Sequence, residues 1–97
     1  MRLRLTRRAL ADLEIIARYL EARSPQAAKR VEMAIRAAIN RLVDYPSTGR
    51  RQSVSAVRKI VTSEYGYIVY YDVDIALKEI SILTIQHGRQ ERSYEDG

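Results

Sequence analysis

The sequence predicts an α+β fold in which a short strand and a helical hairpin pack on a small, mainly antiparallel β-sheet. Apolar residues recur at three- and four-residue spacing from about residue 7 to residue 44, which is typical of amphipathic helices. After residue 57 the chain turns to short runs rich in Val, Ile and Tyr, which favour strands. A chain of 97 residues suits one core, so we expect a single domain over residues 1–97 in the order β-α-α-β-β-β.

The first strand and helix follow from the N-terminal pattern. Residues Arg2 to Thr6 alternate basic and apolar side chains, which indicates a strand with one solvated face. Thr6 is a favourable N-cap, and we expect a first helix from about Arg7 to Arg23. Its predicted core positions are Leu10, Leu13, Ile16, Ala17 and Leu20.

A second helix begins at Ser24-Pro25, because Ser is a good N-cap and Pro is tolerated in the first helical turn. It is expected to end near Asp44, ahead of Tyr45-Pro46, so the two helices form an antiparallel hairpin. Its predicted apolar stripe is Ala28, Val31, Ile35, Ala38 and Leu42.

The second half predicts a polar loop followed by a meander. Residues Pro46 to Ala56 contain Pro, Gly and Ser, as loops do. Val57 to Thr62, Tyr67 to Val73 and Glu79 to Gln86 are the expected strands. The last of these runs has apolar residues at both even and odd positions, so both of its faces are expected to be covered, which indicates an interior strand. The helices are expected on one face of the sheet, which leaves the opposite face uncovered.

Composition excludes several kinds of site. The chain has no Cys, which excludes a disulfide framework, a thiol nucleophile and a Cys-based zinc site. The presence of a single His, His87, argues against an imidazole metal site, and Asp72, Asp74 and Glu79 are expected as turn residues. We therefore expect neither a metal nor a cofactor. The net charge of +5 and a pI of about 9.8 favour acidic partners. With no membrane-spanning run and no signal-peptide pattern, we expect a cytoplasmic protein that does not contact a membrane.

Several short sequence motifs occur in one order along nearly the whole chain. Three lie in the first half: Arg8-Ala9-Leu10-Ala11-Asp12-Leu13, Pro25 with Ala27-Ala28 and Arg30, and Tyr45-Pro46 with Gly49-Arg50. Four lie in the second half: Val57-Arg58-Lys59-Ile60-Val61, Tyr67-Ile68-Val69-Tyr70-Tyr71, Ile80-Ser81-Ile82-Leu83 and His87-Gly88-Arg89. Together they resemble the RelE/ParE superfamily of toxins from type II toxin–antitoxin systems.

The resemblance implies a RelE/ParE-like fold and a bacterial toxin silenced by a cognate antitoxin. The antitoxin is expected to be acidic, to wrap the toxin with its C-terminal segment, and to bind operator DNA through its own N-terminal domain, so that the toxin reaches operator DNA only through it. Two targets occur in the superfamily. RelE-like members cut mRNA on the ribosome, whereas ParE-like members bind DNA gyrase without being enzymes.

Metal-free RNA cleavage needs a base, an acid and cations around the phosphate. If the chain is an endoribonuclease, its catalytic residues are expected to be Arg58, Arg89, His87 and Tyr94. The acid–base pair is incomplete, because His87 alone has an ordinary pKa near neutrality, at ~6.5, and Tyr94 one of ~10. We therefore favour gyrase inhibition. On either mechanism the residues expected to contact the target or antitoxin are Arg50, Arg51, Arg58, Lys59 and Arg89.

Structural interpretations compete with these roles. His87 can simply end its strand, and the arginines can be solvated surface charges. The tyrosines could stack on bases in a non-toxic RNA-binding module, a third function for the chain. Some of these tyrosines are better explained as core residues in a chain without Phe or Trp; the four are Tyr65, Tyr67, Tyr70 and Tyr71.

Overall fold

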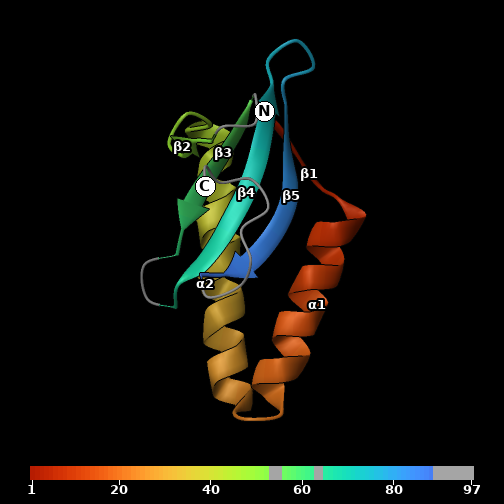
Figure 1. The fold of residues 1–97 in the computed structure, drawn as a ribbon, viewed down its shortest axis with the longest axis vertical. Helices are drawn as coiled ribbons and strands as arrows, with labels where there is room; N and C mark the ends of the chain where they lie inside the picture. The colour runs from red at the N-terminus through yellow and green to blue at the C-terminus, as the bar shows by residue number, and fades with distance from the viewer. Residues whose placement is uncertain (53–55, 63–64, 89–97) are drawn as a thin grey trace.

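The computed structural model describes residues 1–52, 56–62 and 65–88. Its five strands form one sheet in the order β1-β5-β4-β3-β2, with β1 parallel to β5 and the other neighbours antiparallel (Figure 1). This confirms the predicted α+β class and the interior position of β5. The elements are β1 (Arg2–Leu5), α1 (Arg7–Glu21), α2 (Pro25–Asp44), β2 (Arg50–Arg51), β3 (Val57–Val61), β4 (Tyr67–Asp74) and β5 (Glu79–His87).

Both predicted N-caps are present. The Thr6 hydroxyl accepts a hydrogen bond from the Ala9 amide at 3.1 Å, and Ser24 Oγ accepts one from the Ala27 amide at 3.2 Å. Helix α1 ends at Glu21, two residues before the predicted end. The chain turns there because the Ser24 amide bonds back to the Leu20 carbonyl at 2.7 Å.

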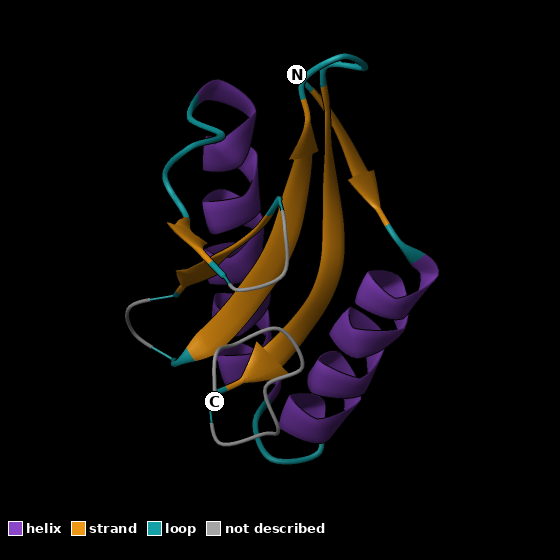
Figure 2. Cartoon of the chain, turned by 45° about the horizontal axis from the view of Figure 1, so that its top comes forward, coloured by secondary structure: helices purple, strands orange, loops and turns teal. Residues whose placement is uncertain are grey.

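The two helices contact the sheet in different ways. Helix α2 lies across one face of the sheet, whereas α1 lies beside β5 (Figure 2). Both contribute to one core with the facing side chains of β4 and β5. The buried core residues are Ala9, Val31, Ile35, Ile39, Leu42, Tyr67, Val69, Tyr71, Ile80, Ile82 and Ile85. Ile39 is buried on α2 although it was not among the predicted core positions, and the prediction of Leu10 as a core residue is wrong, because Leu10 is 55% exposed.

A β-bulge explains how β5 covers both faces. The register shifts so that Tyr71 pairs with Ile82 and Tyr70 with Thr84, which leaves Leu83 as the extra residue. Ile82 and Ile85 therefore reach the same core although their parity differs, and Leu83 packs on the other side.

The prediction that the opposite face is uncovered is wrong at its centre. Ile68 is 4% exposed and Tyr70 is fully buried, and they cluster with Val57 and Leu83. The side chains of Ile68 and Tyr70 are therefore not exposed to solvent at the centre of this face.

The predicted loop from Pro46 to Ala56 contains a short strand. Arg50 and Arg51 form β2, which pairs with β3 at Lys59 and Arg58. The charged side chains of β2 stay exposed while its backbone pairs, as is common in edge strands.

Candidate functional site

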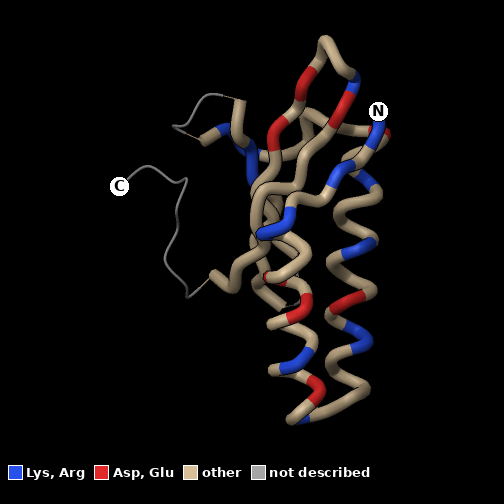
Figure 3. The backbone as a smooth tube through the Cα atoms, turned by 90° about the vertical axis from the view of Figure 1, so that its right-hand side faces the viewer, with Lys and Arg blue, Asp and Glu red and all other residues tan. Residues whose placement is uncertain are grey.

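Four of the predicted contact residues meet at one edge of the sheet. The β2–β3 register places Arg50 opposite Lys59 and Arg51 opposite Arg58. Like charges placed directly opposite one another cost stability, by roughly 0.2–1 kcal/mol a pair. We call these four residues the cationic edge. They are one part of a wider distribution, since Lys and Arg also occur along both helices (Figure 3).

Within the cationic edge, Arg58 differs from its neighbours. Its Nη1 donates hydrogen bonds to the Gly49 carbonyl at 2.8 Å and to the Ser47 carbonyl at 3.4 Å, and the residue is half-buried. Arg50 and Arg51 are exposed. Arg58 therefore holds the segment before β2 in place, while the two exposed arginines are presented to solvent.

Tyr71 also holds the segment before β2 in place, through two hydrogen bonds of its hydroxyl group. Its hydroxyl accepts a hydrogen bond from the Gly49 amide at 2.8 Å and donates one to the Pro46 carbonyl at 2.8 Å. Burial raises the pKa of Tyr71, and the hydrogen bond from Gly49 and the nearby Arg58 charge partly oppose this. A Cβ at residue 49 would collide with the Tyr71 ring, so the position requires glycine. The sequence marked Tyr71 only as a core residue, and Gly49 only within a motif.

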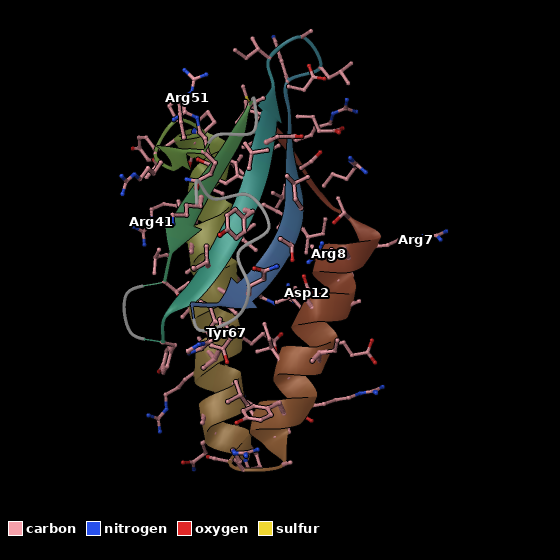
Figure 4. The ribbon with its side chains drawn as sticks, in the orientation of Figure 1. Arg7, Arg8, Asp12, Arg41, Arg51 and Tyr67 are labelled. Atoms are coloured by element: carbon pink, nitrogen blue, oxygen red, sulfur yellow. The ribbon has the colours of Figure 1, made fainter. Side chains whose placement is uncertain are left out.

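A groove of about 760 Å³ lies between α2 and β3, next to the cationic edge. Its charged lining residues are Arg41, Arg50 and Lys59, and no acidic residue is among its described lining residues. Figure 4 shows Arg41 and Arg51 on the same side of the molecule, with Arg7 on the other. Arg41 could not be predicted as part of this groove from the sequence, because only the tertiary fold brings α2 beside β3. The other lining residues are Ala34, Ala37, Ala38, Leu42, Thr48, Ile60, Val61 and Thr62.

His87 lies elsewhere. It ends β5, and its ring meets the Tyr67 ring edge-on with the centroids 5.2 Å apart. His87 is opposite Tyr67 on β4 and Arg58 is opposite Tyr71, which puts them roughly 13 Å apart along the strand direction. The structure therefore does not bring His87 to the cationic edge. Arg89 and Tyr94 lie outside the described residues.

His87 also lines a second groove, of about 520 Å³, between the helices and the end of the sheet. Burial raises the pKa of Tyr67, with a smaller contribution from Tyr19. This groove is mostly apolar and aromatic. Its other lining residues are Ile15, Ile16, Leu20, Val31 and Tyr65.

Two of the three expected turn acids, Glu79 and Asp74, have structural partners. Glu79 pairs with Arg4 at 3.2 Å and with Arg2 at 3.8 Å, and Asp74 accepts a hydrogen bond from the Leu77 amide at 3.0 Å. Over residues 1–52, 56–62 and 65–88, no group of three or more His, Cys, Asp or Glu could hold a metal ion. In the same part of the chain, no helix is long and apolar enough to cross a membrane.

Tyr67, Tyr70 and Tyr71 are buried, which confirms them as core residues.

Comparison with known proteins gives one family. Residues 3–92 match the ParE toxin of the type II toxin–antitoxin system parDE. The toxin Y4kP of Sinorhizobium fredii is 36% identical over 90 residues, covering 93% of this chain and 91% of that protein. Toxin RelE2 of Caulobacter vibrioides is 38% identical over 83 residues, covering 86% and 90%.

Solved structures agree with these matches. A chain of the chromosomal ParDE system from P. aeruginosa superposes with a TM-score of 0.76 at 30% identity, covering 90% of this chain and 95% of that one. A chain of the E. coli RelBE toxin–antitoxin complex gives a TM-score of 0.67 at 14% identity, covering 94% and 98%. The second likeness concerns the fold alone.

Proposed function

The chain belongs to the family of ParE toxins of type II toxin–antitoxin systems, and we propose that, once released from its antitoxin, it arrests growth by inhibiting DNA gyrase. The observation that carries the choice of target is the separation of His87 from the cationic edge. In a nuclease, the side chains that transfer protons and the cations that neutralise charge must both lie within hydrogen-bond reach of the same scissile phosphodiester. Binding to a protein target has no such requirement, and the likeness to the ParDE chain supports it.

A supercoiling assay tests the target. Purified gyrase and relaxed plasmid are incubated with increasing amounts of the toxin, and the topoisomers are separated on a gel. We expect loss of supercoiling and a DNA-damage response in cells that express the toxin alone. Gyrase that keeps its full activity at a large excess of toxin would reject this target.

The second candidate function is ribosome-dependent cleavage of mRNA. The 38% identity to toxin RelE2 favours it, and the cationic edge could stabilise charge on the cleaved phosphate. Arg58, Arg89, His87 and Tyr94 are its proposed catalytic residues. Primer extension on transcripts from arrested cells distinguishes the two candidates, because a nuclease gives cuts at codon boundaries and a gyrase inhibitor leaves the transcripts intact.

The partner in either case is an acidic antitoxin, and both proteins are placed in the cytoplasm with the target. A similar solved chain, 30% identical, comes from a ParDE system, which supports this pairing. Expression of this chain alone should stop growth, and co-expression of the neighbouring gene should restore it. Growth that continues without the neighbouring gene would count against toxicity.

A further inference from the structure

Two large apolar residues lie in the turn between β4 and β5. Ile75 is 78% exposed, the highest value for any large apolar residue that the structure describes, and Leu77 is 57% exposed. The Arg2 amide bonds to the Lys78 carbonyl at 2.8 Å, which brings Met1, itself 39% exposed, beside the turn. The turn projects beyond the other strands (Figure 1). We call Ile75 and Leu77 the apolar tip, and its exposure favours a contact with another protein.

The fold does not need apolar side chains in this turn. Turns favour Gly, Asn, Asp, Ser and Pro, and Asp74 already serves here, because its Oδ1 accepts a hydrogen bond from the Leu77 amide at 3.0 Å. The Lys78 amide bonds to the Ile75 carbonyl at 3.3 Å. Neither residue of the apolar tip belongs to a core cluster of the described chain. The hydrogen bonds fix the backbone of the turn, so a partner that binds the tip loses little affinity to its ordering.

Carboxylates lie behind the apolar tip. Asp72 and Asp74 are two residues apart on β4, so they share one face of the hairpin, and Glu79 is paired with Asp74 across the strands. Arg2 and Arg4 form ion pairs with Glu79, whereas neither aspartate forms an ion pair with any cation that the structure describes. Figure 3 shows acidic segments on both strands of the hairpin. The tip therefore has an acidic base, although the chain carries a net charge of +5.

These charges determine which partner the hairpin fits. Nucleic acid and the anionic surface of a membrane would be repelled by Asp72 and Asp74. The expected antitoxin is acidic too. A protein surface with an apolar pocket and with Lys or Arg at its rim matches both the tip and the carboxylates. Enzymes that hold DNA carry many such cations, because these neutralise the phosphates.

We propose that the β4–β5 hairpin is the part of the toxin that docks on its target. Ile75 and Leu77 enter an apolar pocket on the surface of gyrase, and Asp72 and Asp74 pair with Lys or Arg side chains at the rim of that pocket. This inference rests on the proposed function, because it takes gyrase as the target. It adds the docking element and the chemistry of the surface that receives it.

Removal of the apolar tip provides the first test. Immobilised gyrase holoenzyme is exposed to the wild-type toxin and to the double variant Ile75→Ser/Leu77→Ser, and binding is followed by biolayer interferometry. We expect the variant to bind at least about tenfold more weakly, because a few buried apolar anchors dominate such contacts. The matched control is Leu10→Ser/Met33→Ser, which changes helix residues that are 55% and 63% exposed. It should bind gyrase within about twofold of wild type.

Removal of the charges provides the second test. Asp72→Asn/Asp74→Asn removes both carboxylates but keeps an amide oxygen that can accept the hydrogen bond from the Leu77 amide. We expect this variant to bind gyrase at least about threefold more weakly in about 0.1 M NaCl, with a smaller loss in about 0.5 M, because salt screens the attraction. The control, Glu14→Gln/Glu32→Gln, makes the same change in net charge on the helices. It should bind within about twofold of wild type.

Antitoxin binding distinguishes a docking role from a structural one. The product of the neighbouring gene should bind both hairpin variants within about twofold of wild type, since its contacts lie away from the hairpin. The melting temperature of each variant should stay close to that of its control. Equal losses of antitoxin binding and gyrase binding would overturn the assignment of the hairpin to the target.

The outcomes separate this inference from the proposed function. Gyrase that binds both hairpin variants like wild type would overturn the docking role of the hairpin and leave gyrase as the target. A wild-type toxin that does not bind gyrase would overturn both. In the supercoiling assay, each hairpin variant should need a higher concentration for half-inhibition, in proportion to its loss of binding.

Discussion

At the scale of single residues, the hydroxyl of Tyr71 determines how the cationic edge is presented. It bonds the Gly49 amide and the Pro46 carbonyl, while Arg58 bonds the Gly49 and Ser47 carbonyls. These contacts make the segment before β2 a rigid connection rather than a free loop. Arg50 and Arg51 can therefore face solvent from a defined backbone.

Tyr71→Phe should lower the free energy of unfolding by about 1–3 kcal/mol, because it leaves the Gly49 amide and the Pro46 carbonyl without their partner. Urea unfolding followed by circular dichroism measures the change. Tyr45→Phe is the control, since Tyr45 is 64% exposed and its loss should change stability by less than about 0.5 kcal/mol. Equal stability of the two variants would show that these hydrogen bonds add nothing.

The raised pKa of Asp72 predicts that its contribution to folding stability changes with pH in the opposite direction to that of an ordinary carboxylate. Burial raises its pKa above 3.8, Arg4 lowers it, and Asp74 and Glu79 raise it further. A raised pKa in the folded state means that the stability contribution is present below the unfolded value and is lost as pH rises through the folded value. The charged form of Asp72 therefore opposes folding at neutral pH.

Asp72→Asn should raise the free energy of unfolding near pH 7, by less than about 1 kcal/mol because the residue is only half-buried. Near pH 3, where the wild-type carboxyl is protonated, the gain should vanish. Urea titrations at the two pH values measure it. A gain that is equal at both values would assign the effect to packing rather than to charge.

At the scale of elements, the pairing of α1 with β5 closes an edge that β1 leaves open. Strand β1 pairs with β5 only from Glu79 to Ile82. Beyond that point Asp12 on α1 accepts hydrogen bonds from Thr84 Oγ1 at 2.5 Å and from the Ile85 amide at 3.0 Å. Thr6 also donates to the Ile82 carbonyl at 2.8 Å. Helix α1 therefore satisfies backbone groups that would otherwise form a free strand edge.

Asp12→Ala should cost about 1.5–3 kcal/mol of stability, because it removes a charged acceptor and leaves the Ile85 amide unpaired. Hydrogen exchange followed by NMR should show faster exchange of that amide, and urea unfolding measures the loss. Glu14→Ala breaks only the exposed pair with Arg18, so it should cost less than about 1 kcal/mol. An Ile85 amide as protected as in wild type would contradict this role for Asp12.

Element types could be predicted from the sequence because they depend on local patterns. The caps at Thr6 and Ser24 and the three strands of the meander were all predicted from spacing and residue type. The strand β2, the bulge at Leu83 and the burial of Ile68 were not. Each of these features depends on which strand lies next to it in the sheet. A local sequence pattern does not specify that neighbour.

At the scale of the whole molecule, the net charge of +5 should act mainly on the rate of association. Arginines and lysines over the helices and the sheet attract an acidic partner from a distance, and salt screens this attraction. Figure 3 shows how widely they are spread.

We expect the association rate with the acidic antitoxin to fall about tenfold between about 0.05 M and 0.5 M NaCl. The dissociation rate should change much less, because short-range contacts within a formed complex are screened less by salt than the long-range attraction. Stopped-flow fluorescence measures both rates. Titration with KCl in place of NaCl is the control, and an association rate independent of salt would contradict electrostatic steering.

The sequence by itself determined the fold class, the helix starts, the basic character and the family resemblance, because each depends on local spacing, composition or ordered motifs. Only the tertiary structure decided which cations act together. Arg41 is distant in sequence from Arg50 and Lys59, yet the packing of α2 beside β3 places all three along one groove. His87, which the sequence grouped with the same cations, ends β5 against Tyr67 instead. Side-chain neighbours across strands and helices are set by register and packing, and these form only when the whole chain folds.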